Sequence, residues 1–218
     1  MVYKAIIFGA SGLIGSKLLP MLLQHPQYGE VLAVSRKELP VQHEKLSQAI
    51  INLNDLEQYA SLINGHAIFC CLGTTQSQTP DRDIYYKIDH NYPVTIAKLA
   101  AHNRVEHFHF ISAIGANDKS SNFYLRTKGQ AEQDLKLSGI NSLHIYQPSF
   151  LKGRNDGSRP AEVFINGLMN LVNPLLIGGL KKYRSIKSET VAQAMLNQSL
   201  NNKTGVFTYT TDKIKELV

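Results

Sequence analysis

Three residues whose side chains could carry out proton chemistry lie close together in the sequence: Ser112, Tyr124 and Lys128. Tyr124 and Lys128 are four positions apart, which puts both side chains on one face of a helix. An unperturbed tyrosine titrates at about pH 10, and a nearby lysine cation favours the phenolate and lowers that pKa. The set suits carbonyl chemistry in which Tyr124 exchanges a proton with the substrate oxygen and Ser112 hydrogen-bonds that oxygen to place it.

Each of these residues alone has a simpler explanation. Ser112 could cap a turn, and a tyrosine with a lysine four positions later occurs by chance. Lys128 could also bind the ribose hydroxyls of a cofactor. The interpretation therefore depends on the elements that position the three side chains.

A strand, a glycine turn and a helix open the chain. Ala5–Phe8 is a short apolar run that predicts a buried strand, and an apolar helical pattern follows the turn. Gly9 allows a sharp turn, Gly12 lacks the Cβ that would bar a pyrophosphate, and Gly15 lets helix and strand pack closely. The positive helix end then faces the phosphates. The predicted dinucleotide contacts are Gly9, Ala10, Ser11, Gly12, Leu13, Ile14 and Gly15.

Strands and helices alternate through the first 150 residues, which predicts an α/β fold: a doubly wound, parallel-sheet Rossmann fold. We expect one NAD(P)-binding domain over residues 1–218, with residues 149–205 contributing a small C-terminal substrate-binding lobe. The expected later strands are Glu30–Val34, Ala49–Leu53, Ala67–Leu72, Phe108–Ile111, Leu143–Tyr146 and Val206–Tyr209. The expected later helices are one through Ala97–Ala100, then 122–138 with Ser121 or Asn122 as cap, 161–172, and Thr190–Leu200 capped by Thr190 or Ser188.

The end of the second strand bears on cofactor choice. NAD enzymes place an acid there to hold the ribose hydroxyls, whereas a basic residue accommodates a 2′-phosphate. This chain has Arg36 and Lys37 and no acid before Glu38, which favours NADP, although a solvated basic loop is the alternative. Asn52 and Leu53 would lie near the adenine, and Asp55 could cap the next helix. Further predicted contacts at later strand ends are Cys71, Leu72, Gly73, Lys128 and Pro148.

Composition excludes several classes of protein. With 218 residues, 43% of them hydrophobic and 18% charged, the chain is not disordered. The net charge of +6 is scattered, without a basic stripe, so we expect an anionic cofactor and a small-molecule substrate rather than nucleic acid or a membrane. Adjacent Cys70 and Cys71 rarely form a relaxed disulfide, so buried free thiols in a reducing cytoplasm are expected, with a redox pair as the lesser alternative. Oligomeric state stays open.

The histidines do not have the spacing of a metal site, so no metal is expected. His107 and His109 alternate on a strand, from which we expect one of them to be buried. Arg154 and Arg159 could flank a substrate cleft, but exposed loop arginines are commoner, and they are left out of the catalytic set.

Several sequence blocks resemble a known family. GASGLIG, Ser112 and Tyr124-Leu-Arg-Thr-Lys128 are similar to the atypical branch of the short-chain dehydrogenase/reductase superfamily. CLGTT, SAIGANDKSSNFYLRTKGQAE and QPSFLKGR resemble, more narrowly, the Tat-interacting-protein-type NADP-binding proteins and their bacterial relatives. The resemblance covers nearly the whole chain and implies an NADPH-binding Rossmann fold with a Ser–Tyr–Lys site.

The same resemblance matches individual residues. It puts Arg36 at the 2′-phosphate and matches Asn91 to a helix asparagine of related enzymes. Gln147-Pro148-Ser149 departs from the more usual Arg-Pro-Gly, which leaves the substrate-side contacts open.

Two functions remain at this point. The first is an NADPH-dependent oxidoreductase of the atypical short-chain type that transfers hydride to a small carbonyl or sugar-nucleotide-like substrate, with Tyr124 as acid/base; it includes epimerase-like chemistry. The second is an NADPH-sensing regulatory protein with little turnover, in which the cofactor orders the lobe after Ser149.

Overall fold

A seven-stranded, all-parallel sheet in the order β3-β2-β1-β4-β5-β6-β9 forms the centre of the molecule. The computed structural model describes residues 2–152 and 173–218, so the helix expected over 161–172 lies outside the described residues, as do Arg154 and Arg159. The strands are β1 (Tyr3–Phe8), β2 (Tyr28–Ser35), β3 (Leu46–Ile50), β4 (Ala67–Cys70), β5 (His107–Ile111), β6 (Ser142–Gln147) and β9 (Gly205–Thr210). This arrangement confirms the predicted doubly wound Rossmann fold.

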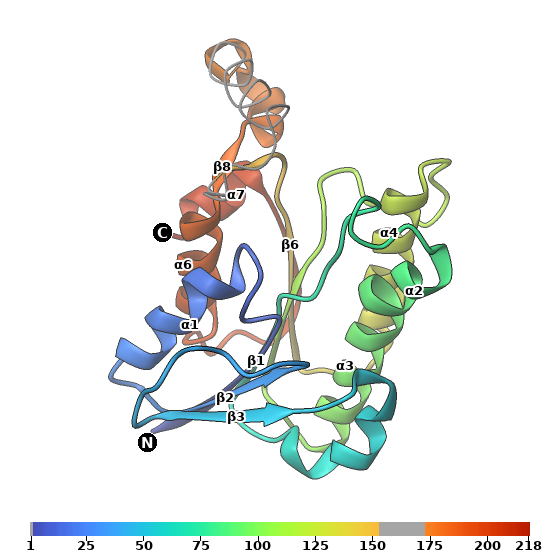
Figure 1. Cartoon of the computed structure of the whole chain (residues 1–218). Helices are drawn as coiled ribbons and strands as arrows, with labels where there is room; N and C mark the ends of the chain where they lie inside the picture. The colour runs from blue at the N-terminus through green and yellow to red at the C-terminus, as the bar shows by residue number, and fades with distance from the viewer. Residues whose placement is uncertain (1, 153–172) are drawn as a thin grey trace.

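Helices cover both faces of the sheet (Figure 1). On one face lie α1 (Gly15–Gln24), α6 (Ser188–Gln198) and α7 (Thr211–Glu216). The other face carries the 3₁₀ helix η1 (Leu53–Leu62), α2 (Arg82–Tyr86), the π-helical turn η2 (Lys87–Asn91), α3 (Tyr92–His102) and α4 (Phe123–Lys136). Apolar side chains of the central strands therefore pack into two separate hydrophobic cores, one on each face of the sheet, as expected for parallel strands buried on both sides.

Several predicted element boundaries and caps were wrong, most of all at the third strand. The third strand is Leu46–Ile50 rather than Ala49–Leu53, because Leu53 already begins η1 and packs into the core. The cap of η1 is Asn52, whose side chain accepts a hydrogen bond from the Asn54 N–H at 3.1 Å, and not Asp55. Helix α6 starts at Ser188, two residues earlier than expected, with no side-chain cap.

The described C-terminal part divides between the main sheet and a small extension. Strand β9 and α6 belong to the main body: β9 pairs with β6, and the ion pair Lys17–Glu189, at 3.1 Å, ties α1 to α6. The extension carries the short parallel pair β7 (Leu151–Lys152) and β8 (Ile186–Lys187), with the 3₁₀ helices η3 (Asn173–Leu175) and η4 (Gly178–Tyr183). The proposed substrate lobe includes this extension.

The strand order reverses between β1 and β4, which is where doubly wound folds bind their ligands. Gly9 follows β1 with a φ of +78°, in the left-handed region that glycine adopts without strain. A Cβ at Gly9 would lie 2.6 Å from the Cys71 carbonyl oxygen, so the two strand ends touch through their main chains. The loops after β1 and β4 thus meet at this point.

Candidate functional site

Helix α4 carries the tyrosine and the lysine. Asn122 caps it by accepting a hydrogen bond from the Leu125 N–H at 3.1 Å, as one of the two expected caps. Tyr124 stands in the first turn and is 39% exposed, whereas Lys128, one turn later, is 3% exposed. Ser112 follows the last residue of β5 directly and is 2% exposed.

Lys128 forms a buried ion pair that the sequence did not reveal. Its Nζ lies 2.8 Å from Oδ1 of Asp89, donates to the Ile111 carbonyl oxygen at 2.9 Å, and stands 4.9 Å above the Phe110 ring. Asp89 is fully buried, and its Oδ2 accepts the Thr74 N–H at 2.9 Å. The pair therefore connects η2, the loop after β4, the end of β5 and α4.

The π-helical turn decides which residue of its segment reaches the site. Asp89 lies inside η2 and faces Lys128, while Asn91, two residues on, is exposed and bonds to His90 at 2.8 Å. Single π-helical turns are frequent at functional sites because they shift the helical register locally. The structure thus places Asp89, rather than Asn91, beside Lys128.

The pKa of Tyr124 is raised, contrary to the expected net lowering. Burial raises this pKa most, the Lys128 charge acts against it, and Asp89 adds a further increase. For Lys128, burial works to lower the pKa, but Asp89 and Tyr124 outweigh it, so the net pKa is raised. At neutral pH the site therefore holds a protonated phenol beside a lysine cation that is already paired with Asp89.

Ser112 is already engaged inside the protein. Its hydroxyl donates to Oε1 of Glu132, which is 5% exposed and stands one turn after Lys128 on α4. The side-chain amide of Gln147, at the end of β6, donates to the same carboxylate at 2.8 and 3.1 Å. Glu132 was not among the predicted site residues, although Tyr124, Lys128 and Glu132 recur every four residues.

The glycine turn has the shape expected for a phosphate loop. A Cβ at Gly12 would lie 3.2 Å from the Gly9 carbonyl oxygen, and one at Gly15 would overlap that oxygen. In the described part of the chain, the N–H groups of Leu13, Ile14 and Gly15 have no backbone acceptor. Unpaired N–H groups at a helix start bind anions, so these residues fit the pyrophosphate of a dinucleotide.

The remaining predicted cofactor residues lie along the same edge of the sheet. A Cβ at Gly73 would lie 3.6 Å from Oδ1 of Asp89 and 3.8 Å from the Lys128 Nζ, which brings the end of β4 next to this ion pair. Pro148 follows β6 and its carbonyl accepts the Ile114 N–H at 3.0 Å. Ala10 and Leu53 are buried, Leu72 is partly buried, and Ser11 and Asn52 are exposed.

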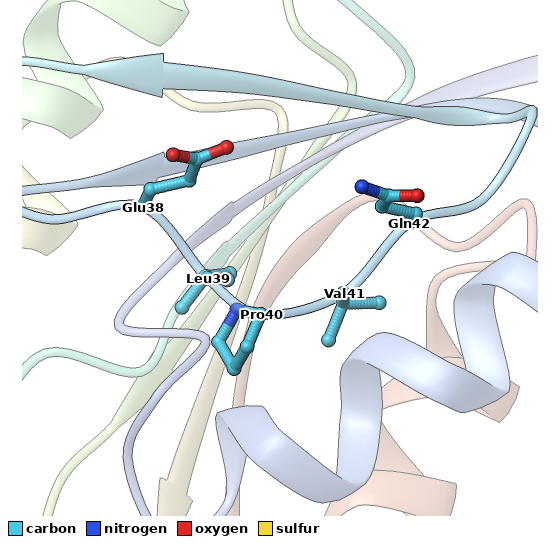
Figure 2. Close-up of a pocket in the computed structure, with 5 residues that line it drawn as sticks. All are labelled: Glu38, Leu39, Pro40, Val41 and Gln42. Atoms are coloured by element: carbon cyan, nitrogen blue, oxygen red, sulfur yellow. The ribbon is translucent and has the colours of Figure 1, made fainter.

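Arg36 and Lys37 follow β2 and are exposed. Among the described residues, no carboxylate pairs with the Arg36 guanidinium, while the Ser35 hydroxyl donates to the Lys37 carbonyl at 2.5 Å. The loop continues over a hollow of about 390 Å³, lined by Glu38, Leu39, Pro40, Val41 and Gln42 (Figure 2). Gln48 of β3 holds this loop, accepting the Leu39 N–H at 2.8 Å.

Both cysteines are free in the structure, as expected. Burial raises the pKa of Cys70 to about 12 and also raises that of Cys71. A thiolate is the reactive form of cysteine, so these raised values argue against the redox alternative.

His107, His109 and His144 form a layer on the opposite side of β5 and β6 from α4, here called the histidine layer. Both His107 and His109 are buried, so the expectation of only one was wrong. The rings of His109 and His144 stack 4.5 Å apart with 6° between their planes. One ring nitrogen of each of these three histidines lies within 4.8 Å of the others, while Nδ1 of His109 and both ring nitrogens of His144 already bond to Tyr146, Ser142 and Tyr209.

Residues 9–202 match the protein family described as NAD(P)H-binding, which covers most of the chain. The chain belongs to this NAD(P)H-binding family. Two similar relatives are Protein HTATIP2 of Rattus norvegicus, 29% identical over 93% of this chain and 83% of its own length, and the mitochondrial protein fmp52 of Aspergillus fumigatus, 30% identical over 89% and 86%.

Solved structures share the fold at low identity. The enzyme WbmH of Bordetella bronchiseptica, in complex with NAD+, superposes with a TM-score of 0.75 at 15% identity, covering 99% of this chain and 79% of that one. The UDP-N-acetylglucosamine 4-epimerase of Methanobrevibacter ruminantium, in complex with UDP-N-acetylmuramic acid, gives 0.72 at 17% identity, covering 96% and 76%. Helices of membrane-spanning length and hydropathy are absent from the described residues.

Proposed function

We propose that this chain is an NADPH-dependent oxidoreductase of the atypical short-chain type, acting on a small carbonyl or a sugar-nucleotide-like compound. The observation that carries the proposal is the Asp89–Lys128 pair, which lies beside Gly73 at the end of β4 and is close enough to Tyr124 to act on its pKa. The nucleotide-sugar ligand of the epimerase with the same fold supports the substrate class.

A bound NADPH would supply the hydride for this chemistry. Tyr124 then donates its phenolic proton to the substrate oxygen, and Lys128 stabilises the phenolate that remains. Asp89 keeps Lys128 in place and charged, since it holds the ammonium at 2.8 Å within a buried site. Ser112, directly after β5, would contact the substrate oxygen and help to place it.

The raised pKa of Tyr124 gives the reaction a direction with pH. A protonated phenol is the donor that reduction needs, so we expect reduction to proceed at neutral pH. Oxidation needs the phenolate, and its rate should rise as the pH approaches the raised pKa of Tyr124.

The test is a panel of carbonyl compounds, nucleotide sugars included, with NADPH absorbance as the readout. Tyr124→Phe should reduce turnover about 10²–10⁴-fold, the usual size of a general acid contribution. Tyr92→Phe is the matched control, because its hydroxyl donates to Asn54 at 2.9 Å outside the catalytic set. Equal turnover by wild type and Tyr124→Phe would remove Tyr124 from the mechanism.

We propose NADPH rather than NADH because Arg36 is free to pair with a 2′-phosphate. Two charge-assisted hydrogen bonds from a guanidinium, discounted for exposure, favour NADPH by about ten- to a hundredfold. Arg36→Ala should remove most of this preference, Lys98→Ala should leave it unchanged, and added salt should narrow it in the wild type. Calorimetric titration of each protein with NADPH and with NADH measures this preference. Equal affinities of the wild type for the two nucleotides would contradict the proposal.

A cofactor-sensing role is the second candidate. It is supported by the resting state of the site, in which Ser112 and Lys128 are already paired with Glu132 and Asp89. Pull-downs with and without NADPH test it: a partner set that changes with NADPH, in a protein without turnover, supports sensing. Partners indifferent to NADPH count against it.

We also propose a cytoplasmic location, supported by the two free cysteines. Fractionation of source cells tests it, because the fungal relative is named mitochondrial and enrichment with mitochondria would contradict the proposal.

A further inference from the structure

Glu132 is a buried carboxylate held between Ser112 and Gln147, which come from the ends of β5 and β6. Both neighbours are neutral donors, and among the described residues no lysine, arginine or histidine forms an ion pair with it. A buried carboxylate without a cation needs its hydrogen bonds to remain favourable. The hydrogen bond from the Ser112 hydroxyl therefore stabilises the buried Glu132 carboxylate and fixes the direction of that hydroxyl.

A serine hydroxyl has one proton to donate and two lone pairs that accept. Because Ser112 gives its proton to Glu132, only its accepting capacity is left for a ligand. A substrate hydroxyl can donate to such an oxygen, whereas a carbonyl oxygen cannot. The sequence-based expectation is that Ser112 hydrogen-bonds the substrate oxygen, and for a carbonyl oxygen that bond would need the proton that Ser112 already gives to Glu132.

We propose that Glu132 is a positioning residue that fixes the Ser112 hydroxyl as a hydrogen-bond acceptor toward the alcohol form of the substrate. Gln147 holds Glu132 in this role, which gives a structural reason for glutamine at the position where the resembling family more often has arginine. An arginine would attract the carboxylate as an ion-pair partner, while the neutral amide leaves it for Ser112. The inference rests on the proposed function, since it concerns how that site holds its substrate.

The test is a double-mutant cycle with Ser112→Ala and Glu132→Gln. Each single variant should lower kcat/KM for oxidation of the alcohol about three- to tenfold, the size expected for one hydrogen bond between neutral groups. Glu132→Gln added to Ser112→Ala should cost less than about twofold more, because Glu132 acts through Ser112. Independent losses that multiply would overturn the proposal.

The control is Asp134→Asn on the same helix, which faces His90 at 3.0 Å and should leave kcat/KM within about twofold of wild type. If Glu132→Gln does not fold, Gln147→Leu is the alternative variant. It removes the hydrogen bonds that the Gln147 amide donates to the Glu132 carboxylate. It should lower kcat/KM in wild type but not in Ser112→Ala. Equal effects in both backgrounds would overturn the proposal.

Urea unfolding of the same four proteins separates this inference from the proposed function. Ser112 and Glu132 should be coupled by at least about tenfold in the unfolding equilibrium, with or without turnover. Coupled unfolding without turnover of any compound would refute the proposed function, and the substrate role of Ser112 with it, while the pairing stands. Additive unfolding would refute the pairing itself, whatever the turnover.

Discussion

Two clusters of buried polar side chains lie on opposite faces of the same sheet. One cluster is buried with its charges paired, and the other is buried in neutral form. The site cluster, Asp89, Lys128, Glu132 and Ser112, keeps its charges and pairs or hydrogen-bonds them. The histidine layer instead stacks its rings on one another, on Phe69 and on Phe207. Its hydrogen bonds go to neutral groups such as Tyr146, Tyr209 and Ser142.

The pKa shifts follow from this difference. Burial lowers the pKa of His107 to about 4 and that of His144 to about 3, and it lowers that of His109 as well. Lys128 is equally buried, yet its pKa is raised because Asp89 is in contact with it. A single opposite charge at contact distance thus decides whether a buried base stays charged or becomes neutral.

The largest expected effect breaks the charged cluster. Lys128→Met leaves Asp89 buried without a cation and should cost about 3–5 kcal/mol of unfolding free energy. The double variant Asp89→Asn with Lys128→Met should recover most of this loss, because neither buried charge remains. Urea unfolding measures both; a double variant as unstable as the single one would show that packing, rather than the unpaired charge, causes the loss.

Acid should act next most strongly, through the histidine layer. In the unfolded state the histidines take up protons at about pH 6.5, whereas in the folded state His107 stays neutral down to about pH 4. The unfolded state therefore binds more protons, and the free energy of unfolding falls as the pH falls below about 6.5. At pH 5.5, one unit below the unfolded value, each histidine that stays neutral costs on the order of 1 kcal/mol, so the three together cost a few kcal/mol. Urea unfolding at pH 7.5 and 5.5 measures this loss, and equal stability at the two values would contradict a neutral layer.

The smallest expected effect concerns one member of that layer. His109→Asn can keep a hydrogen bond to the Tyr146 hydroxyl, which lies 3.1 Å from Nδ1, and asparagine takes up no proton. The stability lost between pH 7.5 and 5.5 should shrink by about a third, the share of one of the three histidines. His102→Asn, outside the layer, is the control. A loss unchanged from wild type would exclude His109 as a source of the acid sensitivity.

The central strands were predictable because each is a short apolar run flanked by turn residues. The exception is β3, where Ser47 and Gln48 interrupt the apolar pattern. It is an edge strand that pairs only with β2, so one of its edges needs no partner. The apolar residues Ile51 and Leu53, which suggested a later strand, instead pack into the core from the following turn and η1.

Only the site residues that follow the regular spacing of a helix were predictable from the sequence. Tyr124 and Lys128 follow the period of a helix, and by the same period Glu132 could have been found. Asp89 could not, because a π-helical turn shifts the register and the 3.6-residue pattern then points to the wrong residue. The rule that residues two apart on a strand share a face predicts that His107 and His109 are buried together.

The pairing of β6 with β9 has a consequence for synthesis. Residues 142–147 leave the ribosome long before residues 205–210. The outer edge of β6 therefore stays unpaired while the intervening chain is made, because its partner is β9. An unpaired strand edge invites association with other chains, and such distant pairings form slowly. Translation arrested before residue 205 would thus release a nascent chain whose sheet still lacks its outermost strand.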